Sequence, residues 1–285
     1  MVDASTSNKS MGGTATDGDL DIAYSLLLAD KVWGSTGKIK YAAIAHLMLE
    51  AIKLQEINKR QHTILMGNET EDEISTNHYY GYDDMRASDF MPSHLTIFKA
   101  YDTTYDWGNI KDTCYNMFLK MQTHGATFIP DFIHNVNNPI AMNSKTARKA
   151  GLSQETNTDA FAYNGCRIPW RVAMGYILNG DSSAKEIVEK MNNYIRKITN
   201  DNPSLINEGY KVDGGLIISD DNTPSPLFFT APFAVSAMVD SNNQDWINRL
   251  WGNMIKKGTT SYYGDTIKMI ALIILSGNYW TEVRK

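Results

Sequence analysis

The chain has 285 residues, of which 42% are hydrophobic and 21% charged, a balance typical of a globular protein rather than a disordered one. A net charge of −5 at pH 7 argues against nucleic-acid binding, which usually requires a basic patch. Two cysteines, Cys114 and Cys166, are too few for a disulfide scaffold or a cysteine-built zinc site. The longest apolar run, 269–275, is far shorter than the roughly 20 residues that span a bilayer. We therefore expect no nucleic-acid or membrane partner, no metal and no other cofactor.

The first 19 residues are rich in Ser, Thr, Gly and Asp. They lack the basic start and apolar stretch of a secretion signal. We expect residues 1–13 to form a loop segment of a single domain that occupies residues 1–285.

Hydrophobic residues recur at helical spacing along most of the chain. Ile22, Leu26 and Trp33, for example, lie on one stripe that stops at Gly34. Similar patterns predict helices over 21–33, 39–58, 92–105, 107–123, 164–178, 182–199, 227–239, 244–256 and 261–275. Alternating β-branched and aromatic residues predict strand-like pieces over 127–133 and 212–219.

The predicted helices form hairpins with short connectors, and a long loop follows each hairpin. The pairs begin near Asp17, Pro92, Asn164 and Leu227, so the starts lie 75, 72 and 63 residues apart. Stacked hairpins of this kind place the long loops at one end of the assembly, where functional sites usually lie. The ninth helix has no partner, which hints at structure missing from the front of the chain.

The densest acidic feature is the run of Asp17, Asp19 and Asp21 at the first helix start. Neighbouring carboxyl groups can have their pKa values driven apart, which suits acid–base catalysis. The same residues could instead cap the helix and solvate its first turn. They could also offer oxygens to calcium, but Gly18 comes too early for an EF-hand loop and position twelve from Asp17 is Leu28.

A second acidic segment, 155–159, runs into an aromatic helix start that carries Arg167 and Arg171. These arginines lie one helical turn apart and could hold carboxylates in a fixed orientation, or form a purely structural salt-bridge cluster. The six histidines show no metal-binding spacing, and the motifs of serine hydrolases and nucleotide-binding loops are missing from the sequence. Fifteen tyrosines and six tryptophans could line a carbohydrate cleft or simply fill the core.

Four segments resemble, in the right order, the sequence blocks of glycoside hydrolase family 8. They are 15–33, which holds the aspartate motif, 86–92, 163–171 and 263–280. The resemblance implies an all-α fold, the (α/α)6 barrel of six inner and six outer helices, with about nine of the twelve in this chain. It also implies endo-acting hydrolysis of a β-1,4-linked polysaccharide with inversion at the anomeric carbon.

Inversion needs one carboxyl group to protonate the leaving oxygen and another to activate water. The resemblance makes Asp17 the aspartate that holds the distorted sugar at the cleavage subsite. Cellulase-like members carry their base where this chain has Asn164, which cannot accept a proton. Chitosanase-like and lichenase-like members place a glutamate in the preceding loop, and Glu155 occupies that position.

Further site residues follow from the same resemblance. Tyr163 and Arg167 would orient the base and its water, and Asp89 and Phe90 of the second block would contact substrate.

One element of the family pattern is missing. The general acid is a glutamate in a Ser-Glu-Gly motif upstream of the aspartate motif, and this chain has no such motif. The nearest string begins at Asn207-Glu208 but lies far downstream and lacks the serine. With three helices also missing, we expect a chain truncated at its N-terminus, with Met1 an internal methionine.

The substrate and the class of protein remain open at this stage. Asn164, Asp89 and the acidic net charge slightly favour chitosan over β-glucan, cellulose or xylan. The competing interpretation is a non-catalytic protein, either a carbohydrate-binding pseudoenzyme or a helical-repeat scaffold. The family resemblance implies an extracellular protein that is monomeric at full length.

Overall fold

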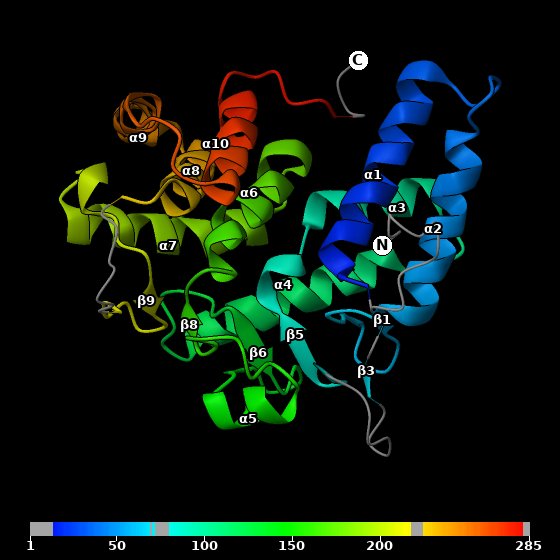
Figure 1. Ribbon diagram of the computed structural model, residues 1–285, viewed down its shortest axis with the longest axis horizontal. Helices are drawn as coiled ribbons and strands as arrows, with labels where there is room; N and C mark the ends of the chain where they lie inside the picture. The colour runs from blue at the N-terminus through cyan, green and yellow to red at the C-terminus, as the bar shows by residue number, and fades with distance from the viewer. Residues whose placement is uncertain (1–13, 69, 72–79, 218–224, 282–285) are drawn as a thin grey trace.

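The computed structural model describes residues 14–68, 70–71, 80–217 and 225–281, and helical hairpins dominate this part of the chain (Figure 1). The α-helices are α1 (Thr16–Trp33), α2 (Tyr41–Gln55), α3 (Pro92–Tyr101), α4 (Trp107–Thr123), α5 (Ser144–Lys149), α6 (Ile168–Asn179), α7 (Ser182–Thr199), α8 (Leu227–Ser236), α9 (Gln244–Lys256) and α10 (Tyr262–Leu275). Short 3₁₀ turns are η1 (Ala87–Asp89), η2 (Gly165–Arg167), η3 (Pro203–Leu205), η4 (Ala237–Val239) and η5 (Ser241–Asn243).

Each predicted helix overlaps a helix of the structure, and α4, α7 and α9 have the predicted bounds. The second predicted helix is too long, because α2 ends at Gln55 and Ile57–Asn58 form β1, and the third ends at Tyr101. The first helix begins earlier than predicted, at Thr16, with Ala15 as its N-cap. Asp17 and Asp19 therefore lie inside its first turn, so the interpretation of either residue as the cap is wrong. The sequence analysis missed α5, because six residues are too few to show a helical period.

The helices form an inner row and an outer row. Contacts run along the inner row from α1 through α3, α6 and α8 to α10, while α2, α4, α7 and α9 pack outside their hairpin partners. The tail after α10 returns to α1, where Tyr279 interacts with Tyr24 and Asp21. Much of the aromatic content fills the core between the rows, including the fully buried Trp107, Phe128 and Trp246.

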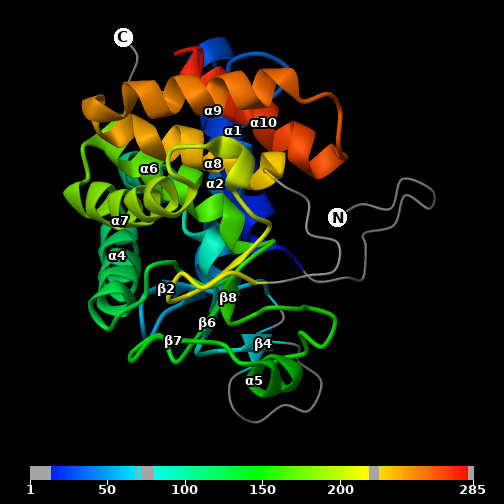
Figure 2. The same ribbon diagram turned by 90° about the vertical axis from the view of Figure 1, so that its left-hand side faces the viewer.

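Small sheets gather at one end of the hairpins, in the long loops (Figures 1 and 2). The strands are β1 (Ile57–Asn58), β2 (Thr63–Ile64), β3 (Thr70–Glu71), β4 (Tyr80–Gly81), β5 (Asp84–Arg86), β6 (Phe132–His134), β7 (Ile140–Ala141), β8 (Ala160–Phe161) and β9 (Tyr210–Lys211). They pair as β1-β2, β3-β4, β5-β6-β7 and β8-β9. The first predicted strand segment overlaps β6 only at Phe132 and Ile133. The second is wrong over its described residues, 212–217, which contain only an isolated bridge at Leu216. Residues 218–219 lie outside the described residues.

The three-stranded sheet positions the segment that follows β5. Arg86 pairs with Phe132 in the antiparallel β5-β6 register, and the chain then turns through η1 into α3. Within the described ranges, no helix is long and apolar enough to cross a bilayer.

A close approach of three helices generates the first prediction. A Cβ atom at Gly175 of α6 would collide with the Tyr115 hydroxyl of α4 and lie 2.9 Å from Cγ of Pro92 in α3. Overpacking of this kind costs about 1–3 kcal/mol. We expect Gly175→Ala to lower the free energy of unfolding by that amount, measured by urea denaturation.

Gly252 of α9 is the matched control, because a Cβ atom there would meet no atom within 4 Å. Gly252→Ala should raise the free energy of unfolding by roughly 0.5–1 kcal/mol, since alanine is the better helix former. Equal effects of the two substitutions would contradict the close packing of α3, α4 and α6.

Candidate active site

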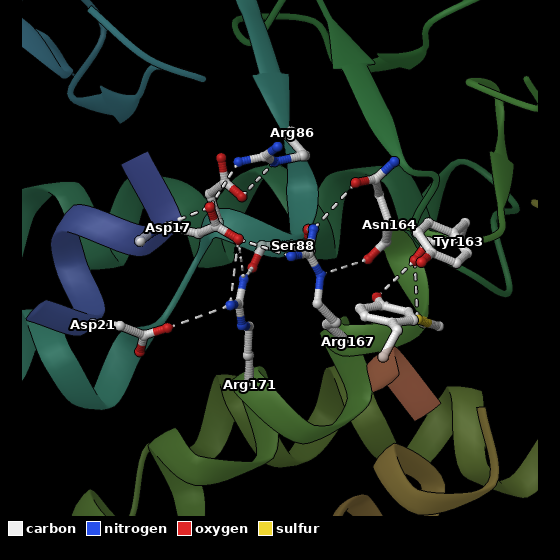
Figure 3. Close-up of polar contacts among 12 residues, drawn as sticks. Asp17, Asp21, Arg86, Ser88, Tyr163, Asn164, Arg167 and Arg171 are labelled. Carbon is white, nitrogen blue, oxygen red and sulfur yellow. Dashed lines mark hydrogen bonds and ion pairs between the residues drawn. The ribbon is translucent and has the colours of Figure 1, made fainter. Parts of the chain in front are cut away.

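Three segments far apart in the sequence meet at the first turn of α1 (Figure 3). The Asp17 carboxylate lies at their junction and is bound by three arginines. Its Oδ1 accepts from Arg86 Nη2 at 2.9 Å. Its Oδ2 accepts from Arg167 Nη1 at 2.8 Å and from Arg171 Nη1 at 3.4 Å. The strand β5 thus supplies Arg86, the turn η2 supplies Arg167, and α6 supplies Arg171.

The arginines fix the ionisation of Asp17. Burial alone would raise the pKa of Asp17, but the positive charges of Arg86, Arg171 and Arg167 outweigh burial and lower it to about 2. Asp17 is therefore a carboxylate at neutral pH and cannot donate a proton there. It can accept hydrogen bonds, for example from sugar hydroxyl groups.

Two further aspartates balance the positive charge. Asp89 accepts from Arg86 Nε at 2.7 Å, and Asp21 lies 3.6 Å from Arg171 Nη2. His94 Nε2 and Asp21 Oδ1 are 2.9 Å apart, which ties Asp21 to α3. Burial, and then the negative charge of Asp17, raise the pKa of Asp89 against the opposing effect of Arg86.

The calcium hypothesis for the aspartate run finds no support. Asp17 and Asp21 bind arginines, and Asp19 interacts with Glu56. Among the residues that the structure describes, no group of three or more histidine, cysteine, aspartate or glutamate side chains could hold a metal ion.

The structure does not support substrate contact by Asp89 or Phe90. Both side chains have no exposed surface, so neither can meet a ligand in the described structure. Asp89 accepts a hydrogen bond from Arg86, and Phe90 packs edge-on against Tyr115 and Phe118 in the core. In the described structure, Asp89 therefore pairs with Arg86 and Phe90 is part of the hydrophobic core.

A chain of hydrogen bonds leads from Asp17 to Glu155. Arg167, which binds Asp17, also donates from Nη2 to Oδ1 of Asn164 at 3.2 Å. Asn164 in turn donates from Nδ2 to Oε2 of Glu155 at 3.2 Å. The Glu155 side chain is exposed, so water can reach its carboxylate. The structure therefore brings Asp17, Arg167, Asn164 and Glu155 into one line.

Tyr163 marks an aromatic pocket next to Glu155. Its side chain is 56% exposed, and its ring stacks on Tyr263 with 4.5 Å between ring centroids. A pocket of about 360 Å³ opens here, lined among others by Thr156, Asn157, Tyr163, Glu208, Phe228 and Tyr263. The sequence analysis did not identify Tyr263 or Phe228 as site residues, although Tyr263 opens the fourth block of the resemblance.

The sequence of the chain matches a known protein family. Residues 1–277 match the family model described as Glycosyl hydrolases family 8, and the chain belongs to this family. The expected fold class, an all-α (α/α)6 barrel, is confirmed by the helical hairpins and by this match.

Named relatives give a closer comparison. The chain is 36% identical over 271 residues to a β-glucanase of Niallia circulans, covering 94% of this chain and 63% of the relative. It is 35% identical over 274 residues to an endoglucanase of Bacillus sp. (strain KSM-330), covering 95% of this chain and 55% of the relative. The chain therefore spans less than two thirds of the length of either relative.

A solved structure supports the same assignment. The apo β-1,3-1,4-glucanase from Paenibacillus sp. X4 superposes with a TM-score of 0.86 at 34% sequence identity. The superposition covers 97% of this chain and 70% of that chain.

The three arginines around Asp17 generate the second prediction. Asp17→Asn removes the anion that the three partly buried guanidinium groups share, and loss of one partner from a buried ion pair costs about 3–5 kcal/mol. We expect a loss of roughly 3 kcal/mol at pH 7, measured by chemical denaturation. Exposed Asp112 of α4 provides the control, and Asp112→Asn should change the free energy of unfolding by less than about 0.5 kcal/mol.

The pH dependence follows from the lowered pKa. Asp17 has a pKa of about 2 in the folded protein, below the value of about 3.9 for an unfolded chain. Its stabilisation is complete above pH 4 and is lost as the pH falls toward 2. The stability difference between the wild type and Asp17→Asn should therefore shrink over this interval, and a difference independent of pH would contradict the account.

Proposed function

We propose that this chain carries the base side of the active site of an endo-acting, inverting glycoside hydrolase that cleaves a β-linked glucan. The observation that carries the proposal is the line of side chains from the arginine-bound Asp17 through Arg167 and Asn164 to Glu155. It joins a carboxylate that is ionised at neutral pH to a solvent-accessible one beside an aromatic pocket.

Glu155 is the general base in this proposal. Asn164 is an amide and cannot take a proton, while the neighbouring Glu155 can. The hydrogen bond from Asn164 fixes one oxygen of the Glu155 carboxyl group. A water molecule bound to the exposed carboxylate could then attack the anomeric carbon from the face opposite the leaving group, which is the geometry of inversion.

Asp17 and Tyr163 bind the sugar in this proposal. Ionised Asp17 accepts hydrogen bonds from hydroxyl groups of the ring at the cleavage point, and Arg167 holds Asp17 in place. The exposed Tyr163 ring, stacked on Tyr263, offers an apolar face to a neighbouring pyranose.

The relatives support β-glucan more than chitosan. The Niallia and Bacillus proteins are named β-glucanase and endoglucanase, and the Paenibacillus structure is named β-1,3-1,4-glucanase. Family 8 xylanases superpose at only 17–18% identity and show the fold alone. We therefore place β-glucan first and retain chitosan as the substrate to be tested against it. Because such polymers are too large to enter a cell, we propose an extracellular enzyme. From the family resemblance alone, we also propose that the full-length protein is monomeric.

The general acid is the missing part of this proposal. Asp17 is ionised, and Asp89 is fully buried, so neither can protonate a leaving oxygen. The sequence contains no Ser-Glu-Gly motif. We propose that the acid comes from outside these 285 residues.

A substrate that needs no acid tests the base directly. Fluoride leaves without protonation, so a β-cellotriosyl fluoride requires only activated water. We expect this chain to hydrolyse the fluoride to the α-anomer of cellotriose. A fluoride electrode measures the rate of fluoride release, and proton NMR identifies the anomer that forms first. Glu155→Gln should lower kcat by at least about 10²-fold, the usual contribution of a general base.

Glu186 of α7, an exposed glutamate on the outer row, is the matched control, and Glu186→Gln should leave kcat unchanged. Retained hydrolysis by Glu155→Gln would exclude Glu155 as the base. The β-anomer as first product would contradict inversion. If wild type and Glu155→Gln both bind cellotetraose and neither hydrolyses the fluoride, the non-catalytic carbohydrate-binding alternative replaces our proposal. Tighter binding of a glucosamine tetramer than of cellotetraose, measured by calorimetry, would favour chitosan.

A further inference from the structure

Asp131 lies buried directly behind the loop that presents Tyr163 and Asn164. It precedes β6, and its side chain accepts three backbone N–H groups from that loop. Oδ1 accepts from Ala162 at 2.7 Å and from Gly165 at 2.6 Å, and Oδ2 accepts from Asn164 at 2.8 Å. With only 1% of its surface exposed, Asp131 cannot meet a substrate.

We propose that Asp131 is the positioning residue of this active site, which holds the loop 162–165 so that Asn164 reaches both Glu155 and Arg167. The inference rests on the proposed function for its catalytic consequence. The sequence analysis did not consider Asp131.

The backbone of the loop curves around the Asp131 carboxylate. Three N–H groups within four residues point at one carboxylate, so the loop wraps around it. A Cβ atom at Gly165 would lie 2.7 Å from Oδ1 of Asp131 and 3.1 Å from Cδ2 of Phe161. Glycine at this position thus permits the backbone to approach the carboxylate.

Asp131 also joins the two halves of the Asp17 cluster. Its backbone oxygen accepts from the N–H of Ala87, which lies between Arg86 and Ser88. Its backbone N–H donates to the carbonyl of Ala160, just before the loop. One residue therefore fixes the segment that supplies Arg86 and the segment that leads to Arg167, and a shift of Asp131 would move both.

The charge of Asp131 is part of this function. A carboxylate offers strong acceptors to all three N–H groups. Protonation weakens one of these acceptor oxygens, and an amide must turn its NH₂ group toward one of the N–H donors. Arg167 and the buried thiol of Cys166 are the titratable groups that interact with it. Burial raises the pKa of Asp131 to about 6, against the opposing effects of the three N–H donors and Arg167.

This pKa separates positioning from stability. Because the folded pKa is raised above the unfolded value, protonation between pH 6 and 4 favours the folded state. The same protonation weakens an acceptor of the loop. If Asp131 affected activity only through the stability of the fold, acidification from pH 6 to 4 would not lower kcat. If Asp131 positions the loop, kcat should fall over the same interval.

The direct test follows the backbone amide protons of Ala162, Asn164 and Gly165 by ¹H–¹⁵N NMR between pH 4.5 and 8. Carboxylate acceptors shift amide protons downfield, so we expect all three signals to titrate together with a midpoint near 6. The measurement on the wild type needs no substrate and no variant. Amide signals of Ala162, Asn164 and Gly165 that respond to pH independently of one another would overturn the proposal.

The catalytic test uses Asp131→Asn with the β-cellotriosyl fluoride. A misplacement of about 1 Å can cost 10²-fold, so we expect kcat to fall roughly 10- to 100-fold, while KM changes by less than about threefold. The wild-type kcat should decline as the pH falls through 6, and Asp131→Asn should lack this decline.

The matched control is Asp102, a buried aspartate at the far end of α3 that also accepts several hydrogen bonds, from Thr104 and Trp107. Asp102→Asn should lower the unfolding temperature and leave kcat and its pH profile unchanged. Wild-type kcat in Asp131→Asn would overturn the positioning function even if hydrolysis is confirmed. If the amides titrate but the wild type hydrolyses no fluoride, the proposed function fails and the catalytic part of this inference fails with it.

Discussion

The site depends on one electrostatic constraint, the convergence of Arg86, Arg167 and Arg171 on Asp17. Burial of a guanidinium group without an anionic partner is strongly destabilising. The three segments that carry these arginines therefore meet where carboxylates can pair with them. Asp17, Asp21 and Asp89 contribute as many formal negative charges as the three arginines contribute positive ones. The result is a rigid, charge-balanced junction in which Asp17 is kept ionised.

The remainder of the site is positioned by this junction and by Asp131 behind it. Arg167 transmits the position of Asp17 to Asn164, and the backbone of Asn164 is fixed independently by Asp131. Of the four side chains in the line from Asp17 to Glu155, only that of Glu155 is exposed. A reactive side chain held by buried neighbours can keep its position while remaining accessible to water and substrate.

Much of the fold could be predicted from the sequence, because amphipathic helices carry their period locally. The bounds of α4, α7 and α9 were predicted to the residue, whereas α5 and the two-residue strands depend on tertiary contacts and carry no such signal. In the site, the motif order identified Asp17 and Arg167. It could not show which way a side chain points, so Asp89 was taken for a substrate contact although it is fully buried. Asp131 stands 31 residues before the loop that it holds, and no pattern in the sequence links the two.

The most direct test of the account is a crystal structure of the Glu155→Gln variant with cellotetraose bound. We expect the oligosaccharide to cross the line of side chains from Asp17 to residue 155. A hydroxyl group of one ring should be hydrogen-bonded to the Asp17 carboxylate, and a water molecule should be held by the glutamine near the anomeric carbon. Cellotetraose bound away from Asp17, or with residue 155 on the same side as the leaving oxygen, would contradict the proposed active site.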